Sequence, residues 1–279
     1  MSDMELSPER REELLSLLDN ESRLKTEYPK LAEYLDIAPS LSGTGNDQRD
    51  GEFDLRLIEV MTRANSTTQN PYWEIVAPAV SDVGERRVID GGNPKGSPRL
   101  AFAQTVLQDA YAFAILAPET VQWVSEVCGS QTIVELGAGR GYWAKHLRQS
   151  GVTIDAYDIK PPTSDQSETY AAPGVLPGTW ADVDVLEKLE PDELGARTLL
   201  LCWPPGWGDT MASEALKTFE DAGGEQLIYV GEPQGGKTGD DLFFDGLAAR
   251  WRMESKDPNF VSWWNNTDGA QAWTRTGSL

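Results

Sequence analysis

Residues 132–158 read TIVELGAGRGYWAKHLRQSGVTIDAYD, and this stretch decides the fold. A short apolar run ends at the glycine-rich segment GAGRG, a helical stretch follows, and a second apolar run ends at Asp158. Glycines allow a backbone to turn sharply and to approach a ligand closely, because they carry no Cβ atom. The stretch therefore predicts a strand, a tight turn, a helix and a parallel second strand.

The same alternation continues toward the C-terminus. Apolar runs at 198–203 and 226–231 predict further strands, and helical patterns occupy 211–223 and 240–251. Strands that alternate with helices favour an α/β fold, with a doubly wound, mostly parallel, Rossmann-like sheet covered on both faces. Residues 260–275 resemble a closing hairpin.

The chain before this region has a different pattern. Ser7 can cap the first of two short helices within 7–36, and another helix is expected at 53–64. The expected organisation is a helical and loop-rich N-terminal accessory segment at 1–100 and an α/β domain at 101–279. That domain opens with predicted helices at 101–117 and 118–127.

The glycines and the acid have an informative spacing. Gly137, Gly139 and Gly141 follow the first strand, and Asp158 ends the second strand 21 residues after Gly137. In a doubly wound sheet, ligands bind beyond the C-terminal ends of the strands, where an acid can accept both hydroxyls of a ribose. The dinucleotide fingerprint G-x-G-x-x-G requires a glycine at 142, but Tyr142 stands there.

The segment E-L-G-A-G-R-G (135–141) resembles motif I of the class I S-adenosylmethionine-dependent methyltransferases, and the resemblance covers roughly 131–275. The region is also similar to uncharacterised methyltransferase-like proteins of bacteria and archaea. The resemblance implies S-adenosyl-L-methionine as cofactor. By this resemblance, the three loop glycines would contact the methionine part of the cofactor and Asp158 would bind its ribose. Glu135 would orient the loop or hold the ammonium group of the cofactor. The resemblance also implies adenine near the segment after the third strand, and aromatic walls near the carboxylate and sulfonium. The implied adenine residues are Thr179, Trp180 and Asp182, and the implied walls are Tyr111 and Trp143.

The expected acceptor side is the segment C-W-P-P-G-W (202–207), at the end of the strand 198–203. Amino-group methyltransferases often place Asp or Asn before Pro-Pro at this point, but here the position is Trp203. Trp203, Pro204 and Pro205 are therefore expected to shape a pocket for a flat or apolar small-molecule acceptor, with Glu232 facing that acceptor. Methyl transfer needs little acid–base help when a nucleophilic acceptor is well aligned in a dry site.

Two other functions are compatible with the sequence. Residues 231–238 read GEPQGGKT, which matches the phosphate-loop pattern G-x-x-x-x-G-K-[ST] of nucleotide hydrolases. Against it, Pro233 removes one backbone N–H from the phosphate cradle, and the neighbouring apolar strand offers no magnesium-binding acid. The other alternative is a non-catalytic protein that binds S-adenosylmethionine without an acceptor.

Composition narrows the function classes further. The net charge is -21 over 279 residues and the pI is about 4.4, so long-range repulsion disfavours nucleic-acid partners. One histidine and two cysteines exclude a multi-His or Cys-rich metal site. The charged N-terminus and the lack of a long apolar run predict a cytoplasmic protein without a membrane span. Excess carboxylates with only 24 Lys plus Arg are typical of halophilic proteins.

The charge balance predicts a response to salt. Self-repulsion among uncompensated carboxylates should destabilise the fold at low ionic strength, because the screening length grows from about 3 Å at 1 M to about 30 Å at 0.01 M. The melting temperature should therefore rise steeply as KCl is added, which calorimetry or circular dichroism can follow. A flat response up to molar salt would identify an ordinary acidic protein.

Overall fold

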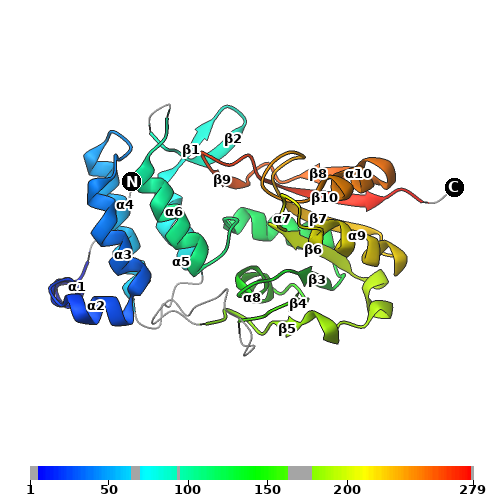
Figure 1. Cartoon of the computed structure of the whole chain (residues 1–279), viewed down its shortest axis with the longest axis horizontal. Coiled ribbons are helices and arrows are strands. Elements are labelled where there is room, and N and C mark those ends of the chain that lie inside the picture. Colours follow the sequence, from blue (N-terminus) through cyan, green and yellow to red (C-terminus); the bar gives the residue numbers. More distant parts are fainter. Residues whose placement is uncertain (1–5, 64–69, 93–94, 163–177, 278–279) are drawn as a thin grey trace.

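The computed structural model describes residues 6–63, 70–92, 95–162 and 178–277. Its main feature is a seven-stranded sheet of order β5-β4-β3-β6-β7-β10-β8 (Figure 1). Neighbouring strands are parallel from β5 to β7, and β10 is antiparallel to both of its neighbours. The strands are β3 (Ile133–Leu136), β4 (Ile154–Asp158), β5 (Asp184–Val185), β6 (Thr198–Cys202), β7 (Gln226–Gly231), β8 (Trp251–Lys256) and β10 (Gly269–Arg275). The predicted doubly wound, Rossmann-like α/β fold is confirmed.

Alternate residues of the central strands pack into two separate hydrophobic cores, one on each face of the sheet. Ile133 packs on one face with side chains of α7 and α8, whereas Val134 packs on the other face with α9 and α10. Side chains of a strand point alternately to the two faces, so unbroken apolar runs bury both faces of these strands. The four helices are α7 (Pro118–Cys128), α8 (Tyr142–Gln149), α9 (Met211–Asp221) and α10 (Asp241–Arg250).

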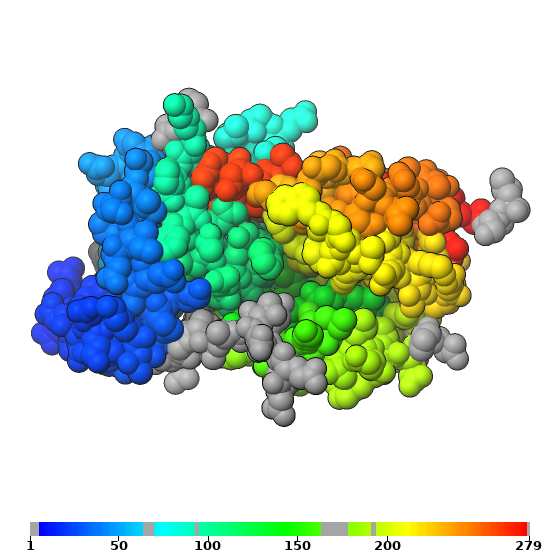
Figure 2. All heavy atoms as spheres, viewed as in Figure 1, coloured from blue at the N-terminus to red at the C-terminus, as the bar shows by residue number. Residues whose placement is uncertain are grey.

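Helices from the N-terminal part form one end of the molecule (Figure 2). They lie beyond the C-terminal ends of the parallel strands, opposite the end where β10 finishes (Figure 1). Ser7 caps the first helix, as predicted, by accepting a hydrogen bond from the Arg10 backbone. The helices are α1 (Pro8–Leu18), α2 (Glu21–Glu27), α3 (Pro29–Ile37), α4 (Asp47–Thr62), α5 (Pro71–Val76) and α6 (Pro98–Ala110), and short 3-10 turns span Ala38–Ser40, Ala77–Ala79, Leu186–Lys188 and Pro191–Ala196.

A second, three-stranded sheet joins the two ends of the chain. β1 (Val80–Val83) and β2 (Arg86–Ile89) form a hairpin, and β9 (Val261–Trp263) pairs with β2 in parallel. The predicted hairpin at 260–275 is therefore wrong, because β10 pairs with β7 and β8 instead. All three side chains of β9 are buried. Burial of β9 is achieved in the second sheet, whereas an edge position in the first sheet would leave the strand partly exposed to solvent. One hydrophobic core also runs through both expected segments, 1–100 and 101–279, so they share packing as well as a sheet.

Two local expectations are also corrected. The helix expected at 101–117 is α6, which ends at Ala110 because Tyr111 leaves helical geometry at φ -122° and ψ -80°. The third strand, β5, follows residues 179–182 rather than preceding them. Among the described residues, no helix is long and apolar enough to cross a membrane, and no group of His, Cys, Asp and Glu could hold a metal ion.

Candidate cofactor site at the C-terminal edge of the sheet

The glycine loop after β3 is fastened to the end of β4. The backbone N–H groups of Gly137 and Ala138 both donate to the carbonyl of Tyr157, at 2.9 and 3.0 Å. The Gly139 N–H donates to Oδ2 of Asp158 at 2.9 Å. The glycines and the acid that the sequence singled out therefore lie in direct contact, beyond the C-terminal ends of two neighbouring strands.

The loop needs glycine at its outer positions. Gly137 and Gly141 have φ values of +77° and +73°, where residues with a Cβ atom are rare. A Cβ at Gly141 would also lie 2.9 Å from the Val183 side chain and 3.2 Å from Ala181. The segment before β5 therefore packs directly against the loop, and a side chain at 141 would push it away.

The end of β4 presents both a polar and an apolar surface. Asp158 is largely buried, and its Oδ1 accepts the Lys160 N–H at 2.9 Å, so each carboxylate oxygen keeps lone pairs for a ligand. The next residue, Ile159, is 68% exposed. The sequence reasoning did not single out Ile159, although an apolar side chain directly after the acid was visible there.

Glu135 lies on β3, beneath the loop, and is almost completely buried. Burial raises the pKa of its carboxyl group to about 8, although the nearby Arg148 and a hydrogen bond from the Ala144 backbone oppose that shift. Its Oε2 atom has no hydrogen-bond partner among the described residues. An uncompensated buried carboxyl group is costly, so it is a candidate for contact with a ligand.

The raised pKa of Glu135 predicts a pH dependence of stability. In the unfolded chain this carboxyl group ionises near pH 4.5, whereas in the folded chain it keeps its proton to about pH 8. Its contribution to stability is therefore fully present below pH 4.5 and is lost as the pH rises to about 8. The free energy of unfolding in urea should fall between pH 5.5 and 8, and Glu135→Gln should remove about 2–3 kcal/mol of that fall. Parallel pH curves for the two proteins would contradict the assignment.

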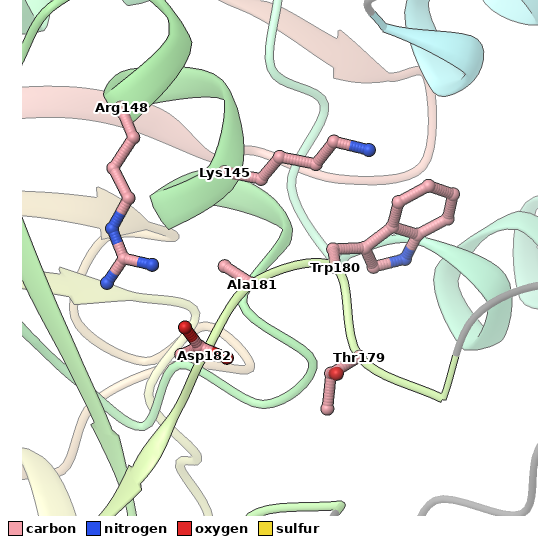
Figure 3. Close-up of a pocket in the computed structure, with 6 residues that line it drawn as sticks. All are labelled: Lys145, Arg148, Thr179, Trp180, Ala181 and Asp182. Atoms are coloured by element: carbon pink, nitrogen blue, oxygen red, sulfur yellow. The ribbon is translucent and has the colours of Figure 1, made fainter.

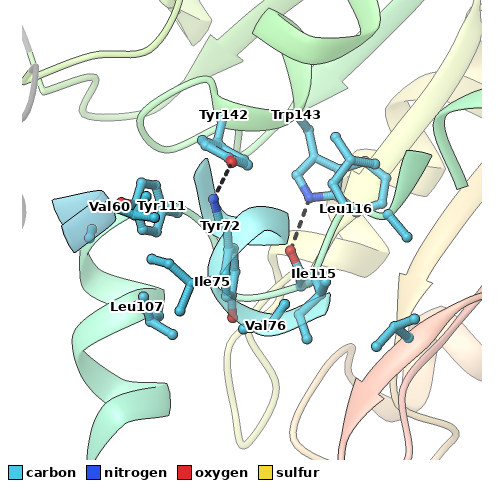
Figure 4. Close-up of a cluster of buried hydrophobic side chains, with 14 of the residues drawn as sticks. Val60, Tyr72, Ile75, Val76, Leu107, Tyr111, Ile115, Leu116, Tyr142 and Trp143 are labelled. Carbon is cyan, nitrogen blue, oxygen red and sulfur yellow. Dashed lines mark hydrogen bonds between the residues drawn. The ribbon is translucent and has the colours of Figure 1, made fainter. Parts of the chain in front are cut away.

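The two predicted aromatic walls belong to the core. Tyr111 stacks on Tyr72 with ring centroids 5.5 Å apart, and Trp143 donates its indole N–H to the carbonyl of Ala114 at 3.3 Å (Figure 4). Only 2% of each side chain is exposed. The prediction that Tyr111 and Trp143 face the cofactor is therefore not supported, because both side chains are buried in the hydrophobic core.

Thr179 and Asp182, two of the predicted adenine residues, line a pocket beside α8 (Figure 3). Trp180, the third, has its ring among those of Tyr111 and Tyr142, with the Lys145 ammonium group 4.6 Å from the ring centroid. Its indole N–H donates to the carbonyl of Ala110, and the half-buried side chain lines the same pocket. The assignment of these three pocket residues to adenine stays a prediction.

The predicted acceptor side forms an aromatic rim at the end of β6. Trp203 stacks on Phe113 with centroids 5.8 Å apart and planes at 15°, and its indole N–H donates to the buried Asp268. Trp203 and Trp207 have positive φ values of 54° and 53°, and Trp207 is 82% exposed. Strained backbone of this kind persists only where the surrounding structure enforces it, and it often occurs at functional sites.

Pro204 and Pro205 connect this rim to the loop after β7. The Pro204 carbonyl accepts the Gly239 N–H at 3.1 Å, and Pro205 forms an isolated β-bridge with Thr238. The two prolines thus connect the end of β6 to the loop after β7. Their predicted place at the mouth of a pocket stays a prediction.

Glu232 has a role other than the predicted one. Its Oε2 accepts the Lys237 N–H at 2.7 Å, and its Oε1 accepts the Thr267 N–H at 2.9 Å. The side chain is buried, and both oxygens face the protein's own backbone. The expectation that this carboxylate faces an acceptor is therefore wrong, because it holds the loop together.

The same contacts disagree with a phosphate loop at 231–238. The Glu232 carboxylate occupies the interior of the loop, where an anionic phosphate would have to lie. The Lys237 ammonium group is bound to Asn266 at 2.7 Å, and the buried Thr238 hydroxyl lies between Tyr229 and the Glu232 N–H. A loop that already encloses its own carboxylate repels a nucleotide phosphate.

No profile of a known protein family matches the chain, and no curated protein does. Solved structures with a partial match include a magnesium protoporphyrin IX methyltransferase from Synechocystis PCC 6803 with bound S-adenosylmethionine. It is 15% identical, covers 56% of this chain and 76% of its own, and has a TM-score of 0.35. The CcbJ methyltransferase from Streptomyces caelestis is 13% identical, with coverages of 57% and 89% and a TM-score of 0.36. An RNA methyltransferase from Salinibacter ruber in complex with S-adenosyl-L-homocysteine is 14% identical, with coverages of 59% and 96% and a TM-score of 0.34. At these identities and TM-scores, the matches assign neither an activity nor a ligand to this chain.

Proposed function

We propose that the protein is an S-adenosylmethionine-dependent methyltransferase acting on a planar small-molecule acceptor. The observation that carries the proposal is the loop 137–141, fastened by Asp158 at the C-terminal edge of the sheet. The neighbours of β3 are β4 on one side and β6 on the other, and chain connections leave in opposite directions there. Such a switch point is where doubly wound sheets bind ligands.

The residues at this edge fit the proposed cofactor. Asp158 offers lone pairs to a pair of ribose hydroxyls, and the exposed Ile159 offers an apolar surface to a flat base. The unpartnered Oε2 of Glu135 lies beneath the loop and suits the ammonium group of an amino acid. Once bound, S-adenosylmethionine would supply an electrophilic methyl group, which bonds to a lone pair of the acceptor as the bond to sulfur breaks.

The acceptor side is inferred from the aromatic rim. Phe113, Trp203 and Trp207 come from two different connections at the same edge, and they offer flat, partly exposed surfaces. Stacked rings contribute about 0.5–1.5 kcal/mol each beyond area burial, which favours a planar acceptor. These side chains position the acceptor and exclude water, so an already nucleophilic atom needs no separate base.

Transfer of an isotope-labelled methyl group tests the proposal directly. The protein is incubated with labelled S-adenosylmethionine and planar aromatic compounds that carry a hydroxyl or amino group, and products are identified by mass spectrometry. Trp203→Ala should lower kcat/KM about tenfold while cofactor affinity changes less than twofold. Trp273→Ala, on β10, serves as the control. Tight cofactor binding with no transfer to any acceptor would favour the non-catalytic binder.

The nucleotide-hydrolase alternative makes an opposite prediction for Lys237. A working phosphate loop needs its ammonium group on the β- and γ-phosphates, whereas here that group binds Asn266. Lys237→Ala should leave S-adenosylmethionine affinity within a few-fold of the parent, a change of about 1 kcal/mol or less. Calorimetry and a phosphate-release assay with Mg²⁺ and ATP or GTP provide the two measurements. Nucleotide hydrolysis that disappears in Lys237→Ala would overturn the methyltransferase proposal.

A further inference from the structure

The short segment 264–268 carries the chain from the small sheet to the large one, between β9 and β10 (Figure 1). Four consecutive residues of this segment bind side chains from other parts of the protein. The pairs are Asn265 with Gln104 of α6, Asn266 with Lys237, Thr267 with Glu232, and Asp268 with Trp203. The last of these contacts joins the segment to the aromatic rim.

Asp268 is the buried link of a chain of hydrogen bonds. Its Oδ2 accepts the indole N–H of Trp203 at 3.2 Å, and its Oδ1 accepts the hydroxyl group of Ser262 on β9. The Arg86 guanidinium of β2 donates in turn to the Ser262 Oγ at 3.2 Å. Only 7% of Asp268 is exposed, and hydrogen bonds to a buried carboxylate are stronger than those between neutral groups.

The orientation of the Trp203 ring depends on this carboxylate. The indole N–H is the one hydrogen-bond donor of a tryptophan side chain. Stacking on Phe113, with planes at 15°, sets the plane of the ring, whereas the hydrogen bond to Asp268 sets the direction of its N–H edge. Trp203 is half-buried, so a planar molecule that lies against the rest of its surface is aligned by the same two contacts.

We propose that Asp268 is a positioning residue of the acceptor site, which holds the Trp203 ring in the orientation that a planar acceptor meets. This inference rests on the proposed methyltransferase function and deepens it by assigning a residue to acceptor orientation. Asp268 acts through Trp203 and is not itself a catalytic residue. The small sheet then has a function as well, because β2 and β9 hold the carboxylate in place through Arg86 and Ser262.

Ionisation of Asp268 makes its hold on the ring sensitive to pH. Burial raises the pKa of its carboxyl group to about 6, although the hydrogen bonds from Ser262 and Trp203 lower it, and the nearby Glu232 adds to the rise. Above that pH the carboxylate accepts the Trp203 N–H as a charged group. Below it, the carboxylic acid is a neutral and weaker acceptor, so the ring is held less firmly.

Other ionisable groups surround Asp268 on α5, β2, β6, β7 and the loop after β7. They are Tyr72, Arg86, Cys202, Tyr229, Glu232 and Lys237. Burial raises the pKa values of Tyr72, Cys202 and Tyr229, so these groups keep their protons between about pH 5 and about pH 8. A change near pH 6 is therefore expected from Asp268, and replacing this residue tests that origin.

The indole resonance of Trp203 reports this contact without any turnover. In the full chain labelled with isotopic tryptophan, the resonance is identified in a proton–nitrogen spectrum by its loss in Trp203→Phe. The proton signal should move upfield as the pH falls, with a midpoint near pH 6, because the hydrogen bond weakens when Asp268 takes up a proton. Asp268→Asn has no ionisable group at this position and should abolish the step.

Asp257→Asn is the matched control, because it removes the charge of another buried carboxylate beside β10. Asp257 accepts the Thr120 hydroxyl at 2.6 Å, and its own N–H donates to the carbonyl of Ala270 at 3.0 Å. Any loss of stability is then compared between two buried acids. The control should leave the pH step of the Trp203 resonance in place.

Methyl transfer to the acceptor that the isotope assay identifies separates positioning from folding. At pH 8, Asp268→Asn should lower kcat/KM about fivefold, because a neutral acceptor replaces a charged one. The affinity for S-adenosylmethionine should change less than twofold. In the Trp203→Phe background, which has no indole N–H, the same replacement should change kcat/KM less than twofold.

The proposal is overturned if the Trp203 resonance does not follow pH, or if its step survives in Asp268→Asn. It is also overturned if Asp268→Asn lowers kcat/KM equally with Trp203 and with phenylalanine at that position, because a general structural role would act in both. A pH step without methyl transfer to any acceptor would support the hold of Asp268 on the ring and count against the methyltransferase function.

Discussion

Replacing Asp158 by alanine should lower the affinity for S-adenosylmethionine about 100-fold. The carboxylate has two functions that fail together: it is the proposed acceptor of two ribose hydroxyls, and it receives the Gly139 N–H that shapes the loop. Hydrogen bonds to a charged group contribute about 1.5–3 kcal/mol each, so the loss of two accounts for this factor. Titration calorimetry measures the affinity directly.

Asp155→Ala is the matched control, because it removes an acid from the same strand. Asp155 forms an ion pair with Arg197 at 2.5 Å, at the other end of β4 from the loop. Its replacement should leave cofactor affinity within twofold of the parent. If both variants lose the same affinity for S-adenosylmethionine, the effect comes from the strand or from overall charge rather than from the carboxylate of Asp158. Unchanged affinity in Asp158→Ala would refute the cofactor site.

Glu232→Gln should lower the free energy of unfolding by about 2 kcal/mol. A glutamine can accept only one of the two backbone N–H groups that the carboxylate now receives from Lys237 and Thr267. Its amide group would then face the other N–H as a second donor, inside a buried loop. Urea denaturation should show the lower free energy of unfolding. The affinity for S-adenosylmethionine should be unchanged when it is measured under conditions in which the variant is folded.

Glu254→Gln is the control for this loss, since Glu254 is paired with Arg252 on the exposed strand β8. Exposed pairs contribute little, so its stability should change by less than about 1 kcal/mol. If Glu232→Gln keeps its stability but loses turnover, the carboxylate contacts the acceptor after all, and the loop-holding role is wrong.

The central sheet was predictable because its strands carry two independent signals. The run ending at Cys202 is continuously apolar from Leu199, and the run ending at Leu136 is interrupted only by Glu135. Each run is followed by a glycine or proline turn and then a helix. The hairpin of β1 and β2 has neither signal, because four of the ten residues in VSDVGERRVI (80–89) are charged and half of the ten are exposed. β9 was recognised as an apolar strand, but a period-two pattern does not specify which sheet a strand joins.

The candidate site was predictable to a similar degree. Gly139 and Asp158 were placed together because turn geometry and strand order bring a loop and a strand end to one edge. Trp143 was not placed correctly, because an aromatic residue in the first turn of the helix after a glycine loop can face either the cleft or the core. The role of Glu232 depends on Thr267, which lies 35 residues away and has no sequence pattern linking it to the loop.

The pairing of β9 with β2 has a consequence for how the chain folds. The Arg86 guanidinium donates to Ser262, 176 residues later, so the small sheet closes only after the chain has been made beyond β9. Contacts of such long range slow folding, because a large loop must be closed before they stabilise anything. During synthesis the hairpin of β1 and β2 leaves the ribosome with one edge unpaired, and that edge stays unpaired until β9 has been made.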